Sequence, residues 1–227
     1  MRVGVLGTGW VGRAIGGKLA DLGHDVAIGT RDPASLMERT EPDQMGRPPF
    51  PVWHADHPQV GIGTFADVAG NADMVVNATQ GAASLEALGS AGEANLDGKI
   101  LIDISNPLDF SHGMPPSLFV CNTDSLGEQI QRAFPGAKVV KTLNTVTAMV
   151  MIEPRSIADG EHTIYVSGDD AGAKAEVTSL LQDGFGWKHV MDLGGIETAR
   201  AVEMALPLWL AIVMKTNDNM FNFSVVR

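Results

Sequence analysis

The sequence predicts an α/β protein with a doubly wound, mostly parallel sheet and a short helical segment at the C-terminus. Short apolar runs alternate with helical patterns along most of the 227 residues, which is typical of βαβ units. A glycine-rich turn follows the first apolar run, where such folds bind nucleotides. Hydrophobic residues make up 44% and charged residues 19% of the chain, so we expect a full, ordered core.

The elements can be assigned in order from the N-terminus. Residues 2–6 form an apolar run, residues 11–22 carry apolar side chains at helical spacing, and 26–28 form a second strand. A strand, a helix and a strand within about thirty residues predict a βαβ unit with parallel strands. Further strands are predicted at 60–63, 74–78, 100–104, 138–143, 162–167 and 188–192, with helices at 64–69, 82–88, 125–134, 170–182 and 197–214.

Two segments interrupt this alternation. Residues 41–58 contain five of the twelve prolines, and residues 107–116 form a second irregular stretch. Loops of this length in a compact domain are usually either functional lids or mobile excursions, and both interpretations stay open for each loop.

Charge and composition disfavour several classes of protein. Sixteen basic and 27 acidic residues give a net charge of −11, which opposes binding to nucleic acid or an anionic membrane. A single cysteine, Cys121, excludes a disulfide framework or a cysteine-rich metal site, and no histidine–carboxylate spacing indicates a metal. The apolar stretch 204–214 is too short to span a bilayer. With no export signal before the first strand, we expect a cytoplasmic protein.

We interpret Cys121 and four of the methionines as part of the core. Cys121 is expected to be a small buried residue, and the methionines are expected to fill gaps in the packing. The methionines considered are Met149, Met151, Met204 and Met214.

The turn Gly7-Thr8-Gly9-Trp10-Val11-Gly12 has the pattern G-x-G-x-x-G between the first strand and the first helix. The first glycine permits the tight turn, the second lets the backbone approach a pyrophosphate, and the third lets the helix pack on the strand. Backbone N–H groups at the start of the helix then face the anion. In this context the pattern predicts a Rossmann-type dinucleotide site rather than a turn without a ligand.

The end of the second strand favours NADP over NAD. A chain that binds NAD usually has an acidic residue there to accept a hydrogen bond from the ribose 2′-hydroxyl, whereas this chain has Thr30 and Arg31. A guanidinium suits a 2′-phosphate because it donates through two prongs. Asp32 follows, and a shift in register would restore the NAD interpretation. We interpret Asp32-Pro33 instead as the start of the next helix.

Three polar turns are predicted to meet where the strands end. They are Asn77-Ala78-Thr79-Gln80, Ser105-Asn106-Pro107 and Leu143-Asn144-Thr145. Ligands of parallel sheets lie outside the carboxyl ends of the strands, although Ser, Thr and Asn are also common in turns and caps. His112, in the second irregular loop, is the one histidine that we consider as an acid or base.

The C-terminal part has no obvious proton donor. About thirty-five residues follow the last predicted strand, and their one lysine, Lys215, comes after the apolar helix. Reduction of a carbonyl needs a donor, whereas hydride exchange with a flavin-like ring depends mainly on alignment. The sequence therefore favours a cofactor or redox dye as the partner over a hydroxy acid.

The chain resembles the family of coenzyme F-420 (F420)-dependent NADP oxidoreductases, which are NADPH:deazaflavin reductases. It resembles more distantly the nucleotide domain of the membrane-bound metalloreductases. The resemblance covers nearly the whole chain. It rests on the glycine turn, on Gly29-Thr30-Arg31, on residues 139–146 (Val-Val-Lys-Thr-Leu-Asn-Thr-Val), on residues 167–170 (Ser-Gly-Asp-Asp), and on residues 192–194 followed by Arg200, Glu203 and Pro207.

The resemblance implies a role for each matching residue. Hydride would pass directly between the nicotinamide and the deazaflavin, without a dedicated catalytic residue or a metal. The NADP site would comprise Gly7, Thr8, Gly9, Trp10, Val11 and Gly12 around the pyrophosphate, Thr30 and Arg31 at the 2′-phosphate, and Ala78, Thr79, Asn106, Pro107, Leu143 and Asn144 at the nicotinamide half. The deazaflavin would stack near Asn144, Thr145 and the C-terminal helix that contains Pro207. Apart from the resemblance, we also include His112, the histidine considered as an acid or base, in the predicted substrate site.

The resemblance also implies a division of the chain. Residues 1–193 would form the NADP-binding domain, and residues 194–227 a helical segment that contributes to the substrate pocket and joins a homodimer. Residues 206–214 are apolar enough for that contact. Residues 41–58 and 109–116 are extra relative to the deazaflavin-specific enzymes and would reshape the entrance.

Three functions remain open at this stage. The leading hypothesis is an NADP-dependent oxidoreductase that acts on a deazaflavin, a flavin or a similar small-molecule electron carrier, with F420 or a flavin as co-substrate. The second is an imine or 2-hydroxy-acid reductase of the pyrroline-carboxylate reductase type. The third is a non-enzymatic module that senses NADPH.

Overall fold

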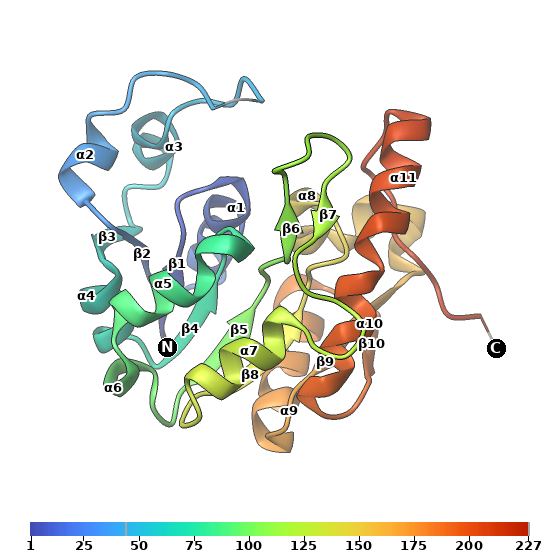
Figure 1. Cartoon of the computed structure of the whole chain (residues 1–227). Coiled ribbons are helices and arrows are strands. Elements are labelled where there is room, and N and C mark those ends of the chain that lie inside the picture. The colour runs from blue at the N-terminus through green and yellow to red at the C-terminus, as the bar shows by residue number, and fades with distance from the viewer. Residues whose placement is uncertain (44, 227) are drawn as a thin grey trace.

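The sheet of the computed structural model, which describes residues 1–43 and 45–226, confirms the predicted α/β class. Its eight strands lie in the order β10-β9-β8-β5-β4-β1-β2-β3 (Figure 1). All neighbouring strands run parallel except β8 and β9. The strands are β1 (Arg2–Leu6), β2 (Asp25–Thr30), β3 (Gly61–Thr64), β4 (Met74–Asn77), β5 (Ile100–Asp103), β8 (Lys138–Thr142), β9 (Thr163–Ser167) and β10 (His189–Asp192).

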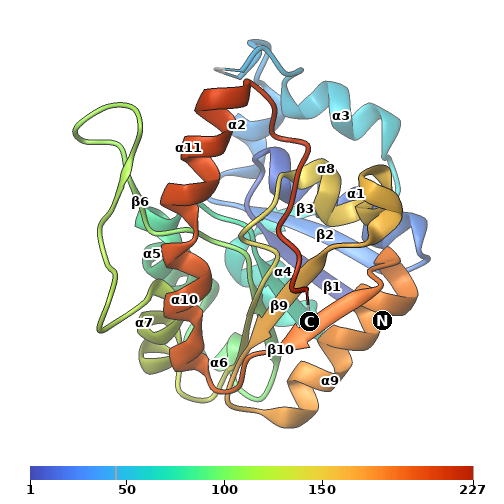
Figure 2. The ribbon, with the colours of Figure 1, turned by 90° about the vertical axis from the view of Figure 1, so that its right-hand side faces the viewer.

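Helices cover both faces of the sheet, which explains why the central strands are continuous apolar runs rather than alternating ones. Figure 2 shows the sheet between these two layers. One buried cluster includes side chains of α1 (Trp10–Asp21), α8 (Ala148–Ile152) and α9 (Ala171–Ser179). The cluster on the opposite face includes side chains of α4 (Phe65–Asn71), α5 (Gly81–Ala91) and α7 (Leu126–Ala133).

Shorter elements complete the described part of the chain. The helices are α2 (Pro33–Met37), α3 (Phe50–Asp56), α6 (Glu93–Leu96), α10 (Ala199–Met204) and α11 (Leu206–Thr216). Short 3-10 helices lie at Pro154–Ser156, Ala158–Gly160 and Ile196–Thr198, and a π-helical turn lies at Leu180–Phe185. None of the described helices is long and apolar enough to cross a membrane.

The prediction of one helix over residues 197–214 is wrong. The segment is divided into α10 and α11, with Ala205 between them. Pro207 has no backbone N–H, so the bond that would continue the helix back to Glu203 cannot form. After α11 the chain turns back, and the backbone N–H of Thr163 in β9 donates to the carbonyl of Phe223 over 3.0 Å.

Both irregular segments contain ordered structure. The 41–58 segment includes α3, whose Phe50 is buried. The second segment opens into an antiparallel hairpin of β6 (Leu108–Asp109) and β7 (Ser117–Leu118). Figure 1 shows α2 and α3, this hairpin and α11 rising around the edge where the central strands end.

Four expectations about sulfur-containing residues are wrong and one is confirmed. Cys121 is exposed, in the connection after β7. Met149, Met204 and Met214 are also exposed, because they lie on the outer sides of α8, α10 and α11. Met151 is buried in the core as predicted.

Candidate functional site

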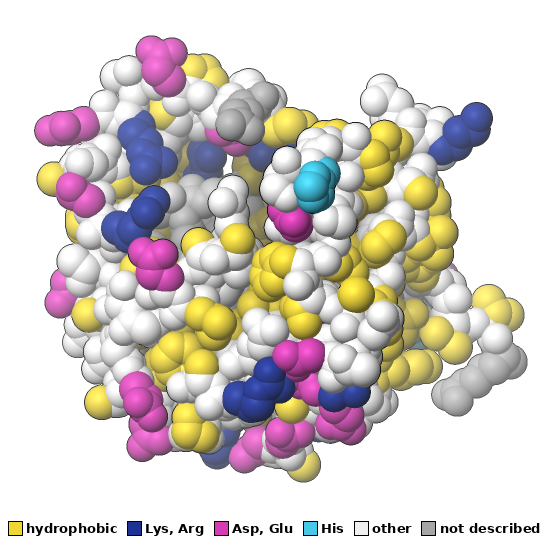
Figure 3. All heavy atoms as spheres, viewed as in Figure 1, with side chains coloured by type: hydrophobic (Ala, Val, Ile, Leu, Met, Phe, Trp, Pro, Cys, Tyr) yellow, Lys and Arg dark blue, Asp and Glu magenta, His cyan; other side chains and the backbone are white. Residues whose placement is uncertain are grey.

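A cleft runs along the carboxyl edge of the sheet. It consists of three adjoining cavities of about 560, 830 and 450 Å³, and Ala78, Thr79 and Gln80 line all of them. We call the first the β2 cavity, since it includes Gly29 to Asp32, and the second the hairpin cavity, since it includes Leu108 to Ser111. The third is the α11 cavity, lined by Leu206, Trp209 and Leu210. In Figure 3 the surface is hollowed beside the hairpin, with basic side chains gathered around the hollow.

The glycine turn has the geometry of an anion cradle. Gly7 has φ +121°, a conformation that favours glycine, and its N–H donates to the Gly29 carbonyl over 3.1 Å. A Cβ at Gly12 would lie 2.0 Å from the Gly7 carbonyl oxygen, so the helix packs directly on the turn. A Cβ at Gly9 would meet no atom within 4 Å. The space in front of Gly9 at the start of α1 therefore fits a pyrophosphate.

Asp32 begins the next helix, as predicted. Its carboxylate accepts from the Ser35 backbone N–H over 3.1 Å and from the Ser35 hydroxyl over 2.7 Å. These bonds, first that of the hydroxyl, lower the pKa of Asp32. Arg31 and Arg39 line the same cavity. Arg39 follows α2, and the sequence analysis did not predict it as a site residue. The available signal was a second arginine close behind Arg31 in the sequence.

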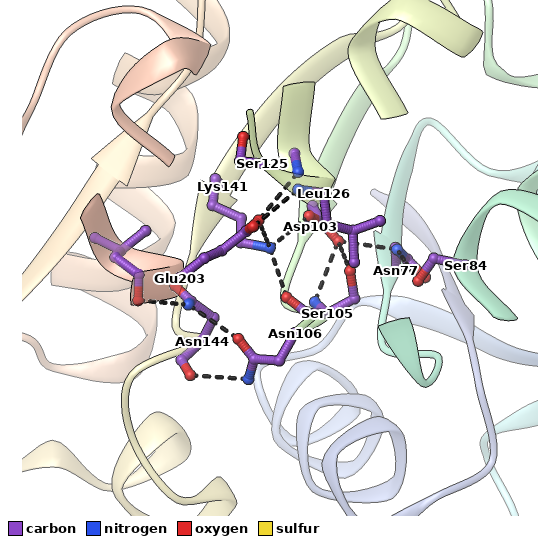
Figure 4. A network of polar contacts seen from close by, with 12 residues as sticks. Asn77, Ser84, Asp103, Ser105, Asn106, Ser125, Leu126, Lys141, Asn144 and Glu203 are labelled. Carbon is purple, nitrogen blue, oxygen red and sulfur yellow. Dashed lines mark hydrogen bonds and ion pairs between the residues drawn. The ribbon is translucent and has the colours of Figure 1, made fainter. Parts of the chain in front are cut away.

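The three polar turns meet, as their positions at the strand ends predict. The Thr79 hydroxyl donates to the Asn77 side-chain oxygen over 2.6 Å, and the Asn77 amide donates to Asp103 over 2.9 Å. The Asn106 amide donates to the Asn144 carbonyl, and the Asn144 amide donates to the Asn106 side-chain oxygen, each over 3.0 Å. Figure 4 shows Asn77 directed toward Asp103, and Asn106 directed toward Asn144.

The predicted site residues take different positions around the cleft. Asn106 and Asn144 line the α11 cavity together with the glycine turn. Leu143 is buried beside them with φ +61°, a strained conformation of the kind that is frequent at functional sites. Thr145 is also buried, and its hydroxyl has no hydrogen-bond partner in the described part of the chain.

Two predicted substrate residues lie apart from this group. His112 is exposed in the hairpin, and Pro207 is exposed in the first turn of α11. Neither residue lines any of the three cavities.

A buried ionic trio lies beneath the turns, and sequence reasoning missed it. Lys141 Nζ lies 2.8 Å from Asp103 Oδ2 and 2.9 Å from Glu203 Oε1, and all three side chains are at most 2% exposed. Burial alone would lower the pKa of Lys141, but the two carboxylates outweigh burial and raise it. The available signals were Asp103 at the end of the apolar strand β5 and Lys141 directly after the two valines of β8.

The trio joins the sheet to the helices around the cleft. Lys141 also donates to the Ser105 carbonyl, and the Ser105 hydroxyl donates to Asp103 over 2.6 Å. Glu203 on α10 accepts from the backbone N–H groups of Leu126 and Gly127 at the start of α7 (Figure 4). The polar turns therefore rest on a fixed base that also sets the position of α10.

Sequence comparison relates the chain to F420-dependent NADP reductases and to a metalloreductase. The family model described as "NADP oxidoreductase coenzyme F420-dependent" matches residues 2–107. An F420-dependent NADP reductase of Methanothermobacter marburgensis is 27% identical over 219 residues, which are 95% of this chain and 93% of that protein. The metalloreductase STEAP3 of Rattus norvegicus is 28% identical over 211 residues, which are 92% of this chain but 37% of that protein.

Structure comparison adds a nearer relative. A crystal structure from Arthrobacter sp. FB24, provisionally described as an F420-dependent NADP reductase, is 56% identical to this chain. It covers 100% of both chains with a TM-score of 0.95.

Proposed function

Because the chain belongs to the family of F420-dependent NADP oxidoreductases, we propose that it transfers hydride between NADP(H) and a deazaflavin, a flavin or a similar electron carrier. The observation that carries this proposal is the continuity of the cleft. It leads from the β2 cavity past the glycine turn to the α11 cavity, so a dinucleotide and a second ring system can lie end to end.

The β2 cavity supports NADP as the dinucleotide. Two guanidinium groups, Arg31 and Arg39, line it beside the Thr30 hydroxyl. Asp32, the carboxylate that would otherwise favour NAD, is engaged as the cap of α2. Donors that bind a phosphate are therefore available at the end of β2, where the ribose of a bound dinucleotide lies.

The α11 cavity supports a ring as the second substrate. NADP(H), when bound, supplies or accepts the hydride, so the protein must align two rings and exclude water. Among the described residues that line the α11 cavity there is no Asp, Glu, His or Lys. Lys141 is fully buried in the ionic trio beneath the turns. This lining suits a reaction that needs no acid from the protein better than it suits carbonyl reduction.

Steady-state kinetics with purified protein tests the proposal. NADPH and NADH are each combined with F420, FMN or riboflavin under anaerobic conditions, and oxidation of the nicotinamide is followed by absorbance. We expect turnover with at least one of these acceptors and a preference for NADPH. Tight NADPH binding without turnover of any flavin-like acceptor would contradict the proposal and favour a sensing module.

Arg31→Ala is expected to weaken NADPH binding by about 1–3 kcal/mol, since a charge-assisted bond to the 2′-phosphate is lost. Binding of NADH should be nearly unchanged, because NADH lacks that phosphate. Fluorescence titration of both nucleotides measures the difference. Arg132→Ala, an exposed change in α7, serves as the control. An equal loss for NADPH and NADH would rule out the 2′-phosphate role.

We further propose that two copies of the chain associate through α10 and α11. Leu208, Met204 and Met214 present apolar surface there, with Leu208 58% exposed. Leu208→Glu is expected to shift the protein from dimer to monomer in sedimentation equilibrium, whereas a monomeric parent protein would refute the proposal.

A further inference from the structure

The lining of the α11 cavity carries a positive charge, although the protein as a whole is acidic. Of the described residues that line it, Arg47 carries the only formal charge, and the rest are apolar or neutral polar residues. The chain as a whole has a net charge of −11. A single cation in a partly enclosed pocket attracts anions even when the protein as a whole is acidic.

The Arg47 guanidinium lies at the junction between the glycine turn and the α11 cavity. It stands 5.1 Å from the centre of the Trp10 ring, and Trp10 is the first residue of α1. Stacking on an aromatic ring holds a guanidinium in place while its N–H groups can still donate at the edge. Its ion pair with Asp43 measures 3.4 Å, with both side chains 33% exposed, so that contact is weak.

The segment that carries Arg47 is fixed to the body of the protein. Asp43 accepts from the backbone N–H groups of Met45 and Arg47, over 2.9 and 3.0 Å, and so closes a tight turn. Arg13 of α1, which is 5% exposed, donates to the Pro48 carbonyl over 2.7 Å. A buried cation therefore tethers the proline-rich 41–58 segment beside the cleft, so the segment is a structured part of the site.

We propose that Arg47 selects electron acceptors that carry a phosphate or carboxylate outside the ring system. This inference rests on the proposed function. Arg47 lines the α11 cavity, whereas the lining of the β2 cavity contains Arg31 and Arg39. The N–H groups at the start of α1 face the pyrophosphate position. The nucleotide thus has donors of its own, and Arg47 is placed to bind the second substrate.

FMN and riboflavin provide a matched test, because they share the ring system and differ in one terminal phosphate. Arg47→Gln is expected to raise the KM for FMN about tenfold, as expected for one charge-assisted contact of about 1.4 kcal/mol. The KM for riboflavin, the kcat with either acceptor and the Kd for NADPH should stay within about twofold. Added salt should raise the KM for FMN in the parent protein and have much less effect in the variant.

The controls separate a specific contact from a general disturbance. Arg132→Gln in α7, far along the chain from the 41–58 segment and exposed, should leave both acceptors unaffected. Equal changes in KM for FMN and riboflavin in Arg47→Gln would overturn the inference, since they would mean that Arg47 only supports the pocket. Weaker NADPH binding at unchanged FMN preference would overturn it by assigning Arg47 to the nucleotide.

A binding measurement distinguishes failure of this inference from failure of the proposed function. FMN and riboflavin are titrated into protein saturated with NADP⁺, and flavin fluorescence is recorded. Stronger binding of FMN that is lost in Arg47→Gln, without turnover, would refute the proposed reaction and support the anion site. If both flavins turn over and Arg47→Gln leaves the preference for FMN unchanged, the reaction is supported and the anion site is refuted.

Discussion

Lys141→Met is expected to lower the free energy of unfolding by about 3–5 kcal/mol, because it leaves two buried carboxylates without a cation. Asp103 and Glu203 are 0% and 1% exposed, so water cannot take the place of the lysine. For a chain of this length the melting temperature should fall by roughly 6–20 °C. Chemical denaturation followed by circular dichroism measures the change.

Lys138→Met on the same strand is the matched control. Lys138 is 45% exposed and its nearest carboxylate, on Asp170, lies 3.5 Å away, so its loss should cost less than about 1 kcal/mol. Equal losses in the two variants would show that the trio contributes little.

Gly12→Ala is expected to lower mainly the stability and Gly9→Ala mainly the NADPH affinity, although both change a glycine of the same turn. At Gly12 a Cβ would overlap the Gly7 carbonyl at 2.0 Å, so the variant should lose about 3 kcal/mol of stability or more. At Gly9 the Cβ meets no protein atom and φ is −71°, so the cost should stay near or below about 1 kcal/mol, the cost of a poorer cap.

Gly9→Ala should nevertheless lose NADPH binding by about 10–100-fold, about 1.4–2.8 kcal/mol, because the methyl group occupies the space that a pyrophosphate needs. Gly89→Ala in α5 is the control, since its Cβ also meets no atom within 4 Å. It should bind NADPH normally and be slightly more stable, because alanine favours a helix. Normal NADPH affinity in Gly9→Ala would place the nucleotide elsewhere.

The sequence was sufficient for the parts of the fold and site that depend on local chemistry. Alternating apolar runs predicted the sheet, and the helix-capping pair Asp32-Pro33 was identified correctly because aspartate followed by proline is a local signal for a helix start. The meeting of the three polar turns followed from parallel topology, which places strand ends at one edge. The hydrogen bonds between Asn106 and Asn144 show this meeting directly.

The features that were missed depend on contacts between distant segments. Glu203 lies 62 positions after Lys141 and 100 after Asp103, so no local pattern reveals that their side chains meet. Arg47 lies in a segment without a helical or strand pattern, and its position over Trp10 depends on how that segment folds back on α1. The division of the C-terminal helix has a local cause: Pro207 lacks the N–H that a continuous helix needs, although the long apolar run around it favours a single helix.

The break at Ala205 separates a helix that is tied to the core, α10, from a helix that lines the cleft, α11. Substitutions in these two helices should therefore differ in their cost to folding. The helix before it is held to the core through Glu203, while the helix after it lines the α11 cavity with Leu206, Trp209 and Leu210, of which Leu206 is buried and the other two are partly exposed. Substitutions beyond the break can therefore accumulate at little cost to folding. Related proteins could in this way differ in what the α11 cavity binds and keep the glycine turn and the β2 cavity unchanged.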